Sequence, residues 1–105
     1  MSTFPGQSVP EAVIHDLGYQ NTDDFLRVQV RHALEQKISY YQSRVDFYQH
    51  KYGMTLDEFQ QRVIDQTDPA LAKFGIIEKE NDDFDWDDAS DFVRIYTADL
   101  QQIRP

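Results

Sequence analysis

The stretch from Val30 to Tyr52 constrains the fold more than any other part of the sequence. Apolar and aromatic side chains recur in it at alternating steps of four and three residues, which is the repeat of a long amphipathic helix. A second row on the same helix recurs at steps of seven residues. The first row contains Leu34, Ile38, Tyr41, Val45, Tyr48 and Tyr52, and the second contains Leu26, Ala33, Tyr40 and Phe47. One helix therefore offers two rows of side chains to bury.

Local signals mark both ends of this long helix, which we expect to span residues 23–52. Asn21 or Thr22 can cap its start, because both side chains accept hydrogen bonds from the first free backbone N–H groups. Gly53 ends it, since glycine readily adopts the left-handed conformation in which many helices stop. No glycine or proline lies between these signals, so the sequence predicts one unbroken helix.

Capping-box patterns predict shorter helices before and after the long one. In an N-terminal arm of residues 1–22, Ser8 and Glu11 have the spacing of a capping box and precede a short helix that ends at Gly18. The motif TLDE repeats that spacing directly after the long helix, and it predicts a helix that ends near Gln66.

A stripe of apolar residues predicts a final helix, which we expect to begin near Asp85 or Asp87. The stripe recurs at steps of three and four and contains Ala89, Phe92 or Val93, Tyr96, Leu100 and Ile103. We therefore predict a single all-α domain over residues 1–105. In it, the two shorter helices fold back end to end along one long central helix, beside a short N-terminal helix. This arrangement covers one row of the long helix and leaves the other partly exposed.

The net charge of −9 is distributed unevenly along the chain. Residues 78–105 carry nine acidic and three basic side chains, whereas residues 23–52 carry four acidic and five basic ones. Binding of nucleic acid and of anionic membranes favours basic surfaces, so both are disfavoured here. A basic protein is the partner that the charge predicts.

The acidic segment of residues 78–91 is open to two interpretations. It does not match an EF-hand calcium loop, because no start within it supplies both glycine at the sixth position and Glu at the twelfth. As a solvated linker it needs no function, since its acids favour the positive N-terminal end of the last helix. As a docking surface for a basic partner it combines charge with aromatic anchors. The candidate partner-binding residues are Asp82, Asp83, Phe84, Asp85, Trp86 and Asp87, of which Trp86 equally suits the core.

The second row of the long helix also has two interpretations. Its rings either pack against other helices of the same chain or meet a second chain, since a tyrosine at an interface can keep its hydroxyl in water. A row left uncovered in a monomer would be a liability. The candidate dimer interface consists of Leu26, Ala33, Tyr40 and Phe47.

The sequence lacks the patterns of an enzyme or a metal site, and we expect neither a cofactor nor a bound metal. It has no cysteine, which excludes disulfides and thiolate ligands. His32 and His50 lie about 27 Å apart along one helix, too far to share a metal. Asp46 and His50 are one turn apart, but two ligands are too few. The first residues lack the features of a signal peptide and no stretch is long enough to cross a membrane, so a cytoplasmic protein is expected.

The stretch YYQSRVDFYQHKYGMTLDEFQQRV, followed by an acidic segment with a tryptophan and a last helix, resembles the small acidic helical antitoxins of bacterial type II toxin–antitoxin pairs. The resemblance covers about Leu34 to Ile103. It implies a protein that neutralises a cognate, usually basic, toxin by covering its surface with residues 78–103. Many such antitoxins also carry a DNA-binding domain, whereas this chain shows no helix-turn-helix, ribbon or basic patch.

We therefore expect a non-enzymatic interaction protein that resembles an antitoxin and binds a basic partner through the acidic segment. The alternative is a structural homodimer that assembles through the long helix. A contact within the chain competes with partner binding, because the basic residues of the long helix can form ion pairs with the chain's own acids. These basic residues are Arg27, Arg31, Lys37, Arg44 and Lys51. Partner binding thus depends on acids that project away from the long helix.

Overall fold

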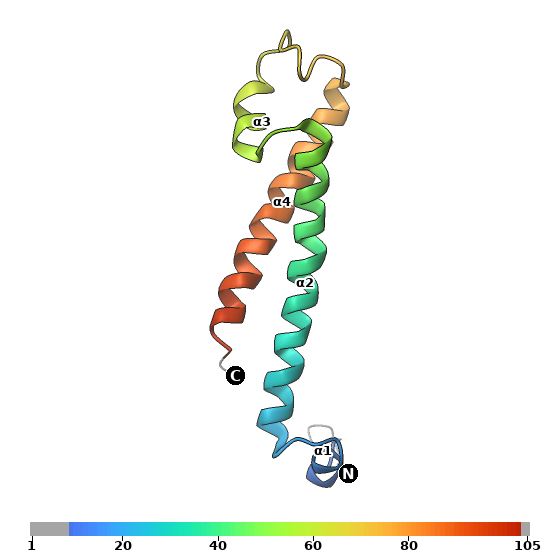
Figure 1. Cartoon of the computed structure of the whole chain (residues 1–105), viewed down its shortest axis with the longest axis vertical. Coiled ribbons are helices and arrows are strands. Elements are labelled where there is room, and N and C mark those ends of the chain that lie inside the picture. The colour runs from blue at the N-terminus through green and yellow to red at the C-terminus, as the bar shows by residue number, and fades with distance from the viewer. Residues whose placement is uncertain (1–8, 104–105) are drawn as a thin grey trace, which may run out of the picture.

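The computed structural model describes residues 9–103, and these residues form helices and turns without any strand (Figure 1). The helices are α1 (Glu11–Asp16), α2 (Thr22–Tyr52), α3 (Leu56–Arg62) and α4 (Ile76–Gln101). Helix α4 runs antiparallel to α2 along its side, so the molecule is a long helical hairpin of 65 × 31 × 18 Å. The predictions of an all-α fold and of a long central helix are confirmed.

Helix α2 begins and ends at the predicted signals. The Asn21 side chain accepts a hydrogen bond from the Asp24 backbone N–H at 2.8 Å. At the other end, Gly53 has a φ of 68° and its N–H donates to the Gln49 carbonyl oxygen at 2.8 Å. A residue with a Cβ is disfavoured at this positive φ, which explains why glycine stands where the helix stops.

Helix α3 is shorter than predicted and does not lie along α2. Its capping box is formed as expected, since Thr55 Oγ1 accepts from the Glu58 N–H at 3.2 Å and Glu58 Oε1 accepts from the Thr55 N–H at 2.9 Å. The helix ends at Arg62 rather than near Gln66. There the guanidinium donates to both carboxylate oxygens of Asp68, at 2.8 and 2.9 Å, and ties the end of the helix to the following turn.

Helix α4 starts at Ile76, so the expected start near Asp85 or Asp87 is wrong. The acidic segment of residues 78–91 is itself helical and is not a linker. Because α4 alone runs beside α2, the prediction that two shorter helices share α2 end to end is also wrong. Helix α3 instead packs at the closed end of the hairpin (Figure 1).

The core lies at this closed end, where α2, α3 and α4 meet. Trp86 is fully buried between the rings of Tyr48 and Tyr52, with centroid distances of 5.7 and 5.9 Å. The buried core consists of Val45, Tyr48, Tyr52, Met54, Phe59, Leu71, Trp86 and Ala89. Further along the hairpin, Tyr41 of α2 packs on Phe92 of α4 at 4.7 Å. The first row of α2 therefore faces α4 throughout the core.

Helix α1 lies beside the first turns of α2. Its Ile14 is buried, and Tyr19 packs edge-on against Phe25 at a centroid distance of 5.2 Å. The predicted cap Ser8 lies outside the described residues, and Pro10 stands at the N-cap position of the helix.

Candidate interaction surfaces

Helix geometry divides the acids of α4 between two faces. Residues three or four positions apart share one face of a helix. Glu78, Asp82 and Asp85 have this spacing and face α2, and we call them the inner acids. The remaining exposed acids lie on the side of α4 that points away from α2.

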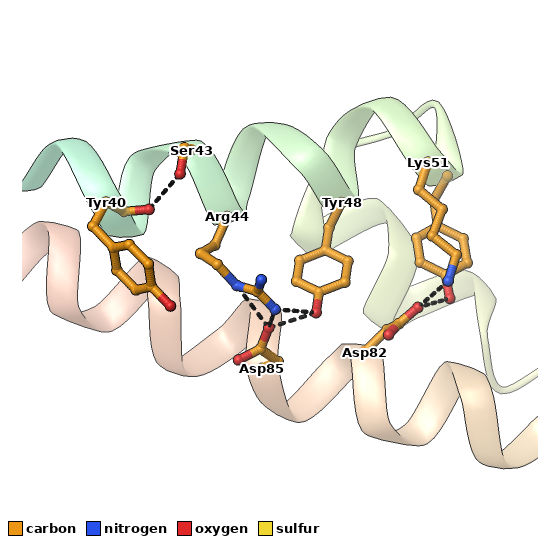
Figure 2. Close-up of polar contacts among 8 residues, drawn as sticks. Tyr40, Ser43, Arg44, Tyr48, Lys51, Asp82 and Asp85 are labelled. Atoms are coloured by element: carbon orange, nitrogen blue, oxygen red, sulfur yellow. Dashed lines mark hydrogen bonds and ion pairs between the residues drawn. The ribbon is translucent and has the colours of Figure 1, made fainter.

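The first inner contact joins Asp85 to Arg44 and Tyr48 (Figure 2). One carboxylate oxygen of Asp85 accepts from Arg44 Nε at 3.1 Å, from Arg44 Nη2 and from the Tyr48 hydroxyl at 2.5 Å. The hydrogen bonds from Arg44 and then from Tyr48 lower the pKa of Asp85 below its usual value. Burial and the hydrogen bond to Asp85 raise the pKa of Tyr48 to about 12. Asp85 is therefore held ionised and Tyr48 neutral.

The second inner contact joins Asp82 and Glu78 to the last turn of α2. Lys51 Nζ lies 2.6 Å from Asp82 Oδ2 and 2.7 Å from Glu78 Oε2. The Tyr52 hydroxyl donates to the same oxygen of Asp82 at 2.6 Å. The hydrogen bonds that Lys51 donates, to Asp82 first and then to Glu78, raise the pKa of Lys51. The bond that Glu78 accepts from Lys51 lowers the pKa of Glu78. Two cations and two phenols of α2 thus hold three acids of α4.

The structure therefore uses four of the six candidate partner-binding residues inside its own fold. Asp82 and Asp85 bind α2, and Asp83 accepts a hydrogen bond from Gln60 of α3 at 2.9 Å. Trp86 is at 0% exposure in the core and is not on the surface. The sequence indicates that the basic residues of the long helix can bind the chain's own acids. The structure contains this contact, because Arg44 and Lys51 of α2 bind acids of α4.

The outer face of α4 carries a different set of residues, with Phe84 at its centre. The Phe84 ring is 74% exposed. Four acidic side chains lie one or two helical turns from it on the same face, and all four are exposed. They are Glu80, Asp87, Asp88 and Asp91. We call Phe84 and these acids the outer face.

Most acids of the outer face have no cationic partner within residues 9–103. Asp91 lies 3.1 Å from Arg94, one turn further along the helix. Glu80, Asp87 and Asp88 have no described Lys, Arg or His nitrogen within 4 Å. Sequence reasoning selected Phe84 and Asp87 but not Glu80, Asp88 and Asp91, although their spacing from Phe84 signals a shared face. That signal is readable only once the segment is known to be helical.

The second row of α2 stays exposed along the hairpin. Leu26, Tyr40 and Phe47 are 52%, 58% and 57% exposed, and Ala33 is exposed as well. Val30 extends the row with 43% exposure. Tyr40 lies one turn before Arg44 on α2 (Figure 2). The structure leaves all four candidate dimer residues available to a second molecule.

The described residues form neither a cluster of metal ligands nor a membrane-spanning helix. Residues 9–103 contain no group of three His, Asp or Glu side chains placed to hold a metal. None of the described helices combines the length and the apolar character that crossing a membrane requires.

No family model matches the chain, and no curated protein or solved structure shows significant similarity to it.

Proposed function

We propose that this protein is a non-enzymatic interaction module that binds a basic partner protein through the outer face of α4. One observation carries the proposal: Phe84 is exposed at the centre of four exposed acids on a helix that is already held in place. Exposed large apolar side chains within a charged rim are typical of binding sites.

The two components of this face have different roles in binding. The Phe84 ring supplies an apolar anchor whose burial stabilises a complex by about 1.5–3 kcal/mol. The carboxylates of Glu80, Asp87 and Asp88, which have no cationic partner among residues 9–103, attract a basic surface and raise the association rate at low salt. Because the inner acids already fix α4 on α2, binding does not carry the entropic cost of ordering this helix.

The resemblance to antitoxins adds a specific role to this proposal, namely neutralisation of a basic toxin. The outer face is then the part of residues 78–103 that covers the toxin, since the inner acids remain bound to α2. The identity of the captured partner tests this role.

Affinity capture with charge-matched variants tests the proposal. Wild type, Phe84→Ala, Asp87→Asn/Asp88→Asn and the control Asp46→Asn/Asp57→Asn are used as baits in native extract, with quantitative mass spectrometry of the captured proteins. The two double variants remove the same charge from different exposed sites. We expect a basic protein to bind wild type and control, and to be lost from both outer-face variants and at about 0.5 M salt. Equal capture by all four baits would overturn the proposal.

A second candidate function is assembly of a homodimer through the second row of α2. The observation that favours it is the exposure of Leu26, Tyr40 and Phe47 in a single row on one rigid helix. Exposed large apolar side chains that recur on one face of a helix are typical of interaction sites.

A further inference from the structure

We propose that two copies of this chain pair through the second row of α2 in antiparallel orientation, with the two-fold axis between Gln36 and Lys37. This inference rests on the second candidate function and is independent of basic-partner binding. It specifies which residues meet across the interface.

The molecule exposes more surface than a compact chain of its size. Its solvent-accessible surface is 7502 Å², whereas a compact protein of the same mass has about 6,100 Å². Its radius of gyration is 21.1 Å, compared with about 13 Å for a compact chain of this length. The excess surface of about 1,400 Å² exceeds the roughly 800 Å² per partner that a stable interface buries. The molecule therefore has enough surface in excess of a compact chain to accommodate an interface with a second copy.

The spacing of the row is symmetric about its centre. The row recurs at equal steps of seven residues, at Leu26, Ala33, Tyr40 and Phe47. If the helix is turned end for end about the midpoint between residues 36 and 37, each position of the row therefore falls on another position of the row. Reversal places Ala33 opposite Tyr40 and Leu26 opposite Phe47. A small side chain then meets a large one, which packs better than two tyrosines or two alanines.

The surface is hollowed at this midpoint. A shallow hollow is lined by Ala33, Gln36, Lys37 and Tyr40, and the same reversal exchanges Ala33 with Tyr40 and Gln36 with Lys37. Two copies related by this axis therefore present the same hollow to each other. The half-exposed Tyr40 ring of each copy fits beside Ala33 of the other as a knob in a hole.

Charge favours the antiparallel over the parallel orientation. A parallel pair in register stacks Lys37 on Lys37 and Arg44 on Arg44 of the other copy. The antiparallel pair places Arg44 opposite Gln29 and Val30, so the two Arg44 side chains lie far apart along the helices. Only the two Lys37 side chains approach each other, and their flexible stems let the ammonium groups reach water. Pairing also leaves Phe84 free, because the outer face lies on the side of α4 away from α2.

Cysteine cross-linking tests the register, since the natural sequence has no cysteine. Gln36→Cys and its control Gln29→Cys place the same residue on the same face of α2, one heptad apart. In the antiparallel pair the two copies of residue 36 lie beside the axis, whereas the two copies of residue 29 are about 22 Å apart along it. We expect mild oxidation to give a disulfide-linked dimer from Gln36→Cys but not from Gln29→Cys. Equal cross-linking, or none from Gln36→Cys, would overturn the inference.

Light scattering separates failure of the register from failure of dimerisation. We expect wild type to be a dimer and Tyr40→Lys/Phe47→Lys to dissociate about tenfold or more readily with unchanged circular dichroism. The pairing should hold or tighten as salt rises, because the two copies carry like charge, whereas basic-partner binding weakens. A wild-type monomer would overturn the pairing and leave the basic-partner proposal standing.

Discussion

Tyr52 on α2 donates its hydroxyl hydrogen to Asp82 on α4 across 2.6 Å, where the last turn of α2 meets the acidic segment. The same carboxylate oxygen binds Lys51. This contact shows why the acidic segment is helical, because each inner acid is matched by a donor on the facing helix.

A double-mutant cycle on this pair measures the strength of the contact. Tyr52→Phe removes the hydroxyl and Asp82→Asn removes the charge that accepts it. We expect each single variant to lower the free energy of unfolding by roughly 1–3 kcal/mol, since hydrogen bonds to charged groups are the stronger ones. The double variant should be less destabilised than the sum of the two. Urea denaturation followed by Trp86 fluorescence gives the values, and strict additivity would argue against the contact.

Acid should weaken the pairing of α2 with α4 through Asp85. The pKa of Asp85 is lower in the folded state than in the unfolded state, where it is about 3.9. The contribution of Asp85 to the free energy of unfolding is therefore fully present above the unfolded pKa and is lost as the pH falls through the folded pKa. We expect wild type to be more stable than Asp85→Asn at pH 7 and this advantage to shrink below about pH 4. Stability measured by circular dichroism across this range checks the prediction. An advantage that stays constant down to pH 2 would contradict it.

Trp86 should tolerate phenylalanine much better than alanine. The indole N–H is buried and finds no acceptor among the described residues, so losing it forfeits no hydrogen bond. We expect Trp86→Ala to lower the free energy of unfolding by about 3–5 kcal/mol because it leaves a large cavity. Trp86→Phe should cost less than half as much, since an aromatic ring can still pack between Tyr48 and Tyr52. Thermal denaturation of the two variants compares them, and equal losses would indicate a bound partner for the N–H group.

The sequence predicts α2 well because its signals are local. The apolar rows, the cap at Asn21 and the stop at Gly53 all act within a few residues of the helix they define. The capping box at Thr55 is correct for the same reason.

The start of α4 carries one weak local signal, the Glu78 side chain three residues after Gly75, which accepts from the Gly75 N–H at 3.3 Å. The first turns of α4 carry many acidic side chains, and in the sequence such a run predicts a solvated linker as readily as a helix. They are helical because Arg44, Lys51 and Tyr52 lie on the facing helix, some 30 to 40 residues earlier in the chain. The sequence alone does not tell which face of α4 packs against α2. It therefore does not tell which acids lie on the inner side of the helix and which lie on the outer face. Whether the second row of α2 was covered also depended on where α4 packed.

The division of the acids between two faces is the central claim, and one comparison of stabilities tests it. Asp82→Asn/Asp85→Asn and Asp87→Asn/Asp88→Asn remove the same charge from the same helix, on opposite faces. We expect the inner pair to lower the free energy of unfolding by about 2 kcal/mol or more. The outer pair should leave it unchanged within about 0.5 kcal/mol or raise it, because those acids repel one another and the described residues give them no cationic partner. Equal destabilisation by the two pairs would contradict the division.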